Sequence, residues 1–260
     1  MKERLSVWGL QMPLAWEDPG ANAAAVDAWM SERPAEADVL VLPEMWATGF
    51  TMHPAECGDH TGSGLAAMQR WAAEADALVC GSLSVVEPNG TAYNRHYAVE
   101  PGGRWTAYDK RHTFTFAGED AQYRAGKARV VVAWRGWNLL LQTCYDARFP
   151  VFSRNRASAP YDGMIYVANW PAARVEAWAT LIRARAIENQ AYLIGVNRLG
   201  EDGNGIAHSG RSAWIDPYGV AVEAAGAGWF GGEWDADELA AFRAKFPVLS
   251  DGDDFELHLS

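Results

Sequence analysis

The 260-residue sequence predicts a layered α/β fold built as one domain over residues 1–260. Three observations predict it. Segments with helical periodicity alternate along the chain with short apolar runs, as expected where helices pack on sheets. Turn signals at 88–90 and 101–103 join neighbouring strands as hairpins, so the sheets should be mixed rather than purely parallel. No Pro/Ser-rich linker or change of composition divides the chain.

The elements follow in order from these patterns. Alternating apolar residues predict a first strand at 5–12, an Ala-rich segment predicts a helix at 22–33, and a short apolar run predicts a buried strand at 38–42. The best helical spacing spans 174–191. The sequence also predicts helices at 64–75 and 235–245, and strands at 77–86, 92–100, 104–108, 129–134, 138–142, 164–168, 192–197, 212–215 and 220–224.

Two segments lack such periodicity. Residues 110–127 form a long polar stretch, and loops of that length are often functional. Residues 247–257 are polar and acidic, and we expect them to form an exposed tail.

The net charge of −11, from 33 acidic and 22 basic residues, disfavours nucleic acid and anionic membranes as partners. An anionic substrate would therefore need an arginine or lysine of its own in the site. The first ten residues read as a strand rather than a signal peptide, and no apolar run approaches the ~18 residues of a membrane span. We expect a cytoplasmic protein.

The three cysteines, Cys57, Cys80 and Cys144, are odd in number and widely spaced, which argues against a disulfide framework. Neither a C-x-x-C pair nor an H-E-x-x-H motif occurs, so we expect no metal and no cofactor. Cys80 lies in an apolar run and is interpreted as a core residue, whereas Cys57 lies in a polar loop.

Three apolar runs each end in a reactive side chain: Glu44, Lys110 and Cys144. Because ligand sites form at the carboxyl ends of strands in α/β sheets, the three groups are expected to converge. Their chemistry is complementary. A thiol is a strong nucleophile once deprotonated, a carboxylate can remove its proton, and an ammonium can stabilise a developing oxyanion.

The surroundings of these residues resemble the nitrilase, or carbon–nitrogen hydrolase, superfamily over nearly the whole chain, and within it the ω-amidase branch. The similar segments are Leu42-Pro43-Glu44-Met45, Tyr108-Asp109-Lys110-Arg111-His112-x-Phe114, Cys144-Tyr145-Asp146-x-Arg148-Phe149-Pro150, Ala168-Asn169-Trp170-Pro171, residues 184–190, Asn197-Arg198, Asp216-Pro217-x-Gly219 and Phe246-Pro247.

This resemblance implies a four-layer αββα sandwich of mixed sheets, commonly paired into an αββααββα homodimer. It implies that Cys144 is the nucleophile, Glu44 the general base, and Lys110 the proton donor and oxyanion stabiliser together with the backbone N–H of Tyr145. Glu119, seven residues before Gly126, fits a second acid that orients the lysine or a water. One departure from the family pattern is Val151, where a glutamate is common.

The resemblance also implies a substrate: a small α-keto acid ω-amide, such as 2-oxoglutaramate or 2-oxosuccinamate, cleaved through a thioester. Phe114, Asn169 and Trp170 are expected to line its pocket. Its carboxylate needs a cationic partner, and the candidates are Arg111, His112, Arg148 and Arg174. Arg148 is the one we place in the substrate site, although it could instead pair with a nearby acid and cap a helix.

Three alternatives stay open at this point, the last of them a pseudoenzyme that acts as an interaction scaffold. The first keeps the enzyme class but changes the substrate, to that of an aliphatic amidase, a nitrilase or an N-carbamoyl amine hydrolase. The second is a non-catalytic redox-sensing protein that uses Cys144 as a reactive thiol.

Overall fold

The computed structural model describes residues 2–253 and 255–258. Its first six-stranded sheet consists of β1 (Arg4–Gln11), β2 (Val39–Val41), β3 (Leu78–Val86), β4 (Ala92–Val99), β5 (Trp105–Asp109) and β14 (Gly228–Asp235). Their order is β14-β1-β2-β3-β4-β5. Strands β1, β2 and β3 are parallel, and the other pairs are antiparallel, so the sheet is mixed as predicted.

The second six-stranded sheet consists of β6 (Val131–Trp134), β7 (Trp137–Thr143), β8 (Gly163–Ala168), β9 (Tyr192–Asn197), β12 (Ala213–Ile215) and β13 (Ala221–Glu223). Their order is β13-β12-β9-β8-β7-β6, with β7, β8 and β9 parallel. Between β9 and β12 the chain forms a separate hairpin of β10 (Leu199–Glu201) and β11 (Ala207–Ser209).

Helices flank the two sheets on their outer faces and at their edges. The longer ones are α1 (Pro19–Ser31), α3 (Ser63–Ala75), α6 (Val175–Asn189) and α7 (Ala236–Lys245). The short ones are α2 (Pro54–Cys57), α4 (Glu119–Gln122) and α5 (Pro150–Ser153), with 3-10 turns η1 (Thr115–Ala117), η2 (Cys144–Arg148), η3 (Ala172–Arg174) and η4 (Val248–Ser250). Among the described residues, no helix is long and apolar enough to cross a membrane.

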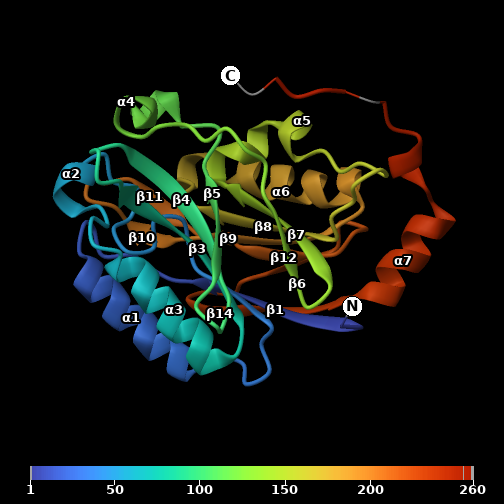
Figure 1. The fold of residues 1–260 in the computed structure, drawn as a ribbon, viewed down its shortest axis with the longest axis horizontal. Coiled ribbons are helices and arrows are strands. Elements are labelled where there is room, and N and C mark those ends of the chain that lie inside the picture. The colour runs from blue at the N-terminus through green and yellow to red at the C-terminus, as the bar shows by residue number, and fades with distance from the viewer. Residues whose placement is uncertain (1, 254, 259–260) are drawn as a thin grey trace.

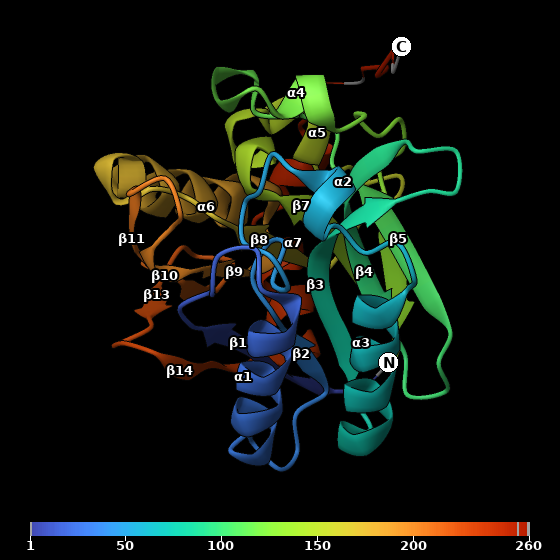
Figure 2. The same ribbon diagram turned by 90° about the vertical axis from the view of Figure 1, so that its left-hand side faces the viewer.

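Figures 1 and 2 show the resulting layers: α1 and α3 lie on one side, the two sheets face each other in the middle, and α6 lies on the other side. The buried layer between the sheets includes Val7 and Val41 from the first sheet and Leu139, Ile165 and Ile194 from the second. The expected four-layer αββα sandwich is therefore confirmed. The sheets approach closely at Gly9, where a Cβ would lie 2.5 Å from Cγ2 of Val196.

Most predicted elements are present, with shifted ends. Helix α1 begins three residues earlier than predicted, because Asp18 accepts a hydrogen bond from the Ala21 N–H (2.9 Å) and Pro19 favours the first turn. Strand β14 and the β10–β11 hairpin were not predicted. The prediction that residues 247–257 form an exposed tail was partly wrong, because Phe255 lies under the guanidinium of Arg156 and Leu257 packs against the core.

Candidate active site

The three reactive residues meet at the carboxyl ends of strands from both sheets. Glu44 follows β2 and Lys110 follows β5 in the first sheet, whereas Cys144 follows β7 in the second. All three are buried, with Cys144 the most exposed at 8%. The predicted convergence is thus present, and the two sheets contribute different members of the trio.

A sharp turn presents the Cys144 thiol. The residue has a left-handed backbone (φ 47°), uncommon for a residue with a side chain, and it begins η2 directly after β7. Buried Asp146 fixes this turn by accepting hydrogen bonds from the Thr143 N–H (2.9 Å) and the Tyr108 hydroxyl (2.7 Å). Asp146 also contacts the His112 Nδ1 at 2.7 Å, which ties the turn to the loop after Lys110.

The Lys110 ammonium lies between two buried carboxylates. Its Nζ donates to Glu44 Oε1 (2.9 Å) and to both oxygens of Glu119 (3.0 and 2.8 Å). The face of the Phe50 ring lies 5.1 Å from the same nitrogen. Sequence reasoning singled out both carboxylates, and the structure places both on the lysine.

Two asparagines complete the hydrogen bonds of the carboxylates. Asn94, on β4, donates through Nδ2 to Glu44 (2.8 Å) and Glu119 (3.0 Å). The Asn169 N–H donates to Glu44 Oε2 (2.7 Å), and its side chain donates to the Glu44 carbonyl. The sequence analysis missed Asn94, because an asparagine inside a strand carries no local sign of a role.

These charges set the protonation states. Burial, and then the Glu44 carboxylate, raise the pKa of the Cys144 thiol well above its usual value, although Lys110 opposes them. Burial alone would lower the pKa of Lys110, but Glu119 and Glu44 together hold it well above its usual value. The resting site therefore holds a neutral thiol beside an ammonium ion. Such a thiol needs a base at the moment of attack.

Glu119 differs from an ordinary surface glutamate. Burial raises the pKa of its carboxyl group, which Lys110 opposes and Glu44 reinforces. It also accepts a hydrogen bond from the Phe114 N–H at 2.5 Å. The residue therefore links the lysine to the wall of the pocket.

A cavity of about 390 Å³ opens onto Cys144 and Tyr145. The four residues predicted to bind substrate, Phe114, Arg148, Asn169 and Trp170, all line it. Arg174, predicted as a candidate cation, lines it too. The remaining lining residues were not predicted to be there: Phe50, Phe116, Ala117, Pro171, Ala173, Asp202, Ile206 and His208. Three of these come from the hairpin region that was not predicted, so no sequence signal could have found them.

The other two cysteines lie outside this cavity. Cys80 is fully buried in the layer between the sheets, as predicted, and burial raises the pKa of its thiol above the usual range. Cys57 is half-buried, and its Sγ lies 3.5 Å from the Thr51 hydroxyl.

A cysteine, a lysine between two glutamates and an αββα sandwich together define a class of thiol-dependent amide hydrolases. The chain belongs to the carbon–nitrogen hydrolase family, whose model matches residues 7–233. It is a hydrolase of the nitrilase superfamily that acts on non-peptide carbon–nitrogen bonds.

Relatives named omega-amidase place the chain in the ω-amidase-like branch of this superfamily. The chain is 46% identical to "Omega-amidase YafV" of Yersinia enterocolitica, covering 95% of this chain and 96% of that one. It is 44% identical to "Omega-amidase YafV" of Escherichia coli K12, covering 97% and 98%. A solved structure of a CN-hydrolase superfamily protein from Xanthomonas campestris superposes with a TM-score of 0.93 at 37% identity, covering 98% of this chain and 99% of that chain.

Proposed function

We propose that this chain is an ω-amidase that hydrolyses 2-oxoglutaramate or 2-oxosuccinamate to the dicarboxylate and ammonia. The arrangement of Cys144, Glu44 and Lys110 is the observation that carries the proposal. The relatives named omega-amidase, and a Bacillus subtilis "2-oxoglutaramate amidase" that is 30% identical over 93% of this chain, support the substrate class.

In the first step the Cys144 sulfur attacks the amide carbon while its proton passes to Glu44. The carbon–oxygen π electrons move onto oxygen and form a tetrahedral oxyanion. Lys110 and the Tyr145 N–H, at the start of η2, stabilise this charge. Losing one such donor typically slows a reaction by ~10²–10³.

In the second step the tetrahedral intermediate collapses. Glu44 returns its proton to the departing nitrogen, the carbon–nitrogen bond breaks, and ammonia leaves behind a thioester on Cys144. Glu44 then takes a proton from water, whose oxygen attacks the thioester carbon. Collapse releases the carboxylic acid, and the proton returns to sulfur. In this scheme Glu119 acts by positioning Lys110.

The purified protein tests this directly. We would incubate it with 2-oxoglutaramate and follow ammonia and 2-oxoglutarate, using Cys144→Ala as the inactive variant and Cys57→Ala as the matched control. Turnover by the native protein and by Cys57→Ala, but not by Cys144→Ala, is the expected result. Turnover that survives Cys144→Ala would overturn the mechanism.

The same assay separates the other members of the class. If a simple aliphatic amide, a nitrile or an N-carbamoyl amine is turned over faster than 2-oxoglutaramate, the substrate assignment is wrong while the nucleophile stands. A redox-sensing role is disfavoured because burial and Glu44 raise the pKa of the thiol, whereas a sensor needs a standing thiolate.

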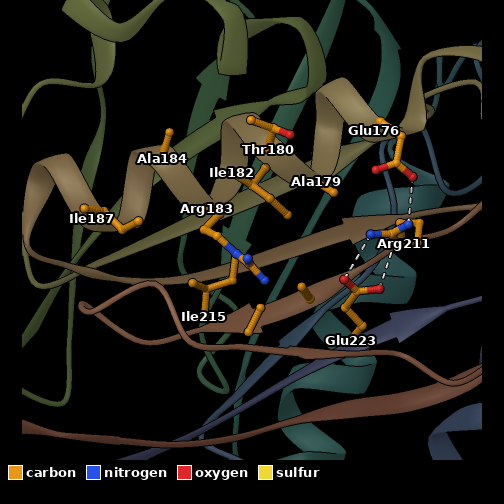
Figure 3. A pocket seen from close by; sticks show the side chains of 12 residues that line it. Glu176, Ala179, Thr180, Ile182, Arg183, Ala184, Ile187, Arg211, Ile215 and Glu223 are labelled. Atoms are coloured by element: carbon orange, nitrogen blue, oxygen red, sulfur yellow. Dashed lines mark hydrogen bonds and ion pairs between the residues drawn. The ribbon is translucent and has the colours of Figure 1, made fainter.

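The proposal includes a homodimer in which the outer faces of α6 from two copies meet. A groove of about 380 Å³ lies there, between α6 and strands β12 and β13. Figure 3 shows its apolar side at Ile182, Ile187 and Ile215, and Arg211 paired with Glu176 and Glu223. Exposed apolar side chains continue the surface at Ile187, Tyr218, Val220 and Val222.

Sedimentation tests this dimer. We expect a dimer for the native protein and a shift towards monomer for Ile187→Glu; a monomeric native protein at micromolar concentration would refute the dimer.

We also propose that residues 1–260 form one catalytic domain and that the protein lies in the cytoplasm, where thiols stay reduced. Cell fractionation would test the location.

A further inference from the structure

The charged side chains that line the active-site cavity are Arg148, Arg174 and Asp202. The Asp202 carboxylate is already engaged, because its Oδ1 accepts the N–H groups of Asn204 (2.8 Å) and Ile206 (3.0 Å) within its own turn. Two arginines against one carboxylate give these lining side chains a net positive charge.

The other cationic candidates face elsewhere. His112 contacts Asp146 through Nδ1 (2.7 Å) and stacks on Phe149 at a centroid distance of 3.8 Å. Arg111 donates to the Gly126 carbonyl (3.2 Å) and does not line the cavity. The candidates for the cationic partner of the substrate carboxylate are therefore two arginines, Arg148 and Arg174.

Arg174 is the better placed of the two. Its guanidinium lies over the rings of Phe114 (5.4 Å) and Phe116 (5.9 Å) and, among the described residues, forms no ion pair with a carboxylate. Aromatic rings that cover the face of a guanidinium leave its N–H edge free for a planar anion. Arg148 is exposed, whereas Arg174 is half-buried, and the Arg148 guanidinium lies over Trp170 at 4.9 Å.

The backbone at Arg174 is held firmly. The Trp170 indole N–H donates to the Arg174 carbonyl (2.8 Å), and the Arg174 N–H donates to the Pro171 carbonyl (3.0 Å). Asn169, which precedes Trp170, donates its N–H to the Glu44 carboxylate. One short segment therefore fixes both the proposed base and this arginine.

The route from nucleophile to arginine is short. The Phe114 ring lies 4.9 Å from the ring of Tyr145, which directly follows Cys144, and the two rings form an aromatic wall. The Arg174 guanidinium lies over the Phe114 ring of this wall at 5.4 Å. A small substrate that presents its amide to Cys144 would extend along the wall with its far end near Arg174.

We infer that Arg174 binds the carboxylate of the substrate and so selects amides that carry an anion at the end opposite the scissile bond. This inference rests on the proposed function. The guanidinium meets the carboxylate with parallel N–H···O bonds, a geometry that a lysine ammonium cannot reproduce. Arg148, which also lines the cavity, adds a second positive charge.

A matched pair of substrates tests this. 2-Oxoglutaramate and 4-oxopentanamide share the amide and the ketone, but a methyl group replaces the carboxylate in the second. For Arg174→Gln we expect KM for 2-oxoglutaramate to rise about 10- to 100-fold, the loss typical of one charge-assisted partner, with kcat little changed. Turnover of 4-oxopentanamide should stay the same. Arg174→Lys should recover part of the loss.

The control is Arg104→Gln, in the turn at the opposite end of β5 from Lys110, where Arg104 pairs with Glu100 (2.8 Å). It should match the native enzyme with both substrates. Equal losses on the anionic and neutral substrates in Arg174→Gln would indicate a merely structural role and overturn the inference, as would no loss on either.

A binding measurement keeps this test separate from the proposed function. If the native protein does not turn over 2-oxoglutaramate, the proposed function fails. The subsite is then judged by calorimetry of 2-oxoglutarate binding to Cys144→Ala, with and without Arg174→Gln. Binding that weakens at least tenfold supports the anion subsite. Absent or equal binding refutes it.

Discussion

Glu119 holds the Lys110 ammonium with both carboxylate oxygens, at 3.0 and 2.8 Å, in a site where each residue is at most 1% exposed. A buried ion pair of this kind becomes a liability when one partner is lost, because the other is left as an uncompensated charge. Glu119 is therefore expected to contribute to the stability of the fold as well as to the position of Lys110.

Glu119→Gln keeps the shape but removes the charge. We expect kcat to fall about 10- to 100-fold with KM nearly unchanged, because the lysine is less firmly placed for the oxyanion. Glu119→Ala should in addition lower the free energy of unfolding by about 3 kcal/mol. Steady-state kinetics and urea unfolding measure both. Normal kcat in Glu119→Gln would contradict a positioning role; exposed Glu201→Gln is the control.

Glu44→Gln should make the Cys144 thiol react faster with an alkylating agent but should abolish amide turnover. The Glu44 carboxylate raises the pKa of Cys144, so its removal lowers that pKa and increases the thiolate fraction at neutral pH. In a Cys57→Ala background, alkylation by iodoacetamide at pH 7.5 should become faster, while amide turnover falls below detection. If alkylation instead slowed together with turnover, the assigned electrostatic effect of Glu44 would be wrong.

Asn94→Asp places a third carboxyl group beside Glu44 and Glu119. Like charges at this distance oppose one another, so we expect kcat to drop at least about tenfold at pH 8. Lowering the pH should restore part of the loss, because protonation of the new carboxyl group removes its charge. The matched control is Asn89→Asp, in the exposed turn before β4, which should behave like the native enzyme across the same pH series.

His96 predicts acid sensitivity. Burial lowers the pKa of this histidine from 6.5 to about 4, so the folded protein keeps it neutral where the unfolded chain takes up a proton. The stability it contributes is complete above pH 6.5 and falls as the pH drops towards 4, by on the order of 3 kcal/mol.

Thermal unfolding between pH 7 and 4.5 measures this effect. His96→Gln should flatten the pH dependence of Tm in that window, whereas exposed His60→Gln should leave it unchanged. An equally steep dependence in His96→Gln would assign the acid sensitivity to other groups.

The parts predictable from sequence are those with strong local signals. Glu44, Lys110 and Cys144 each follow an apolar strand, so the convergence of their side chains could be predicted before any coordinates. The α6 pattern was equally clear. Long-range pairing has no such signal. Strand β14 contains Gly231 and Gly232, which weaken a strand locally, and it forms because it pairs with β1 over its whole length.

The same reason explains the missed site residues. Asn94 sits mid-strand, and its role exists only because β4 brings it beside two carboxylates from other segments. His208 and Ile206 belong to a hairpin region too short to show periodicity. Partners supplied by distant segments can be named only when the fold is known.

The proposed base and nucleophile belong to opposite sheets, and this division has a consequence for remote substitutions. The separation between the thiol and the carboxylate is set by the thickness of the apolar layer where the sheets meet, which Gly9 keeps thin against Val196. A larger side chain there would push the sheets apart and displace one reacting group from the other without touching either. Catalytic rate should therefore report on the packing of a core that no substrate ever reaches.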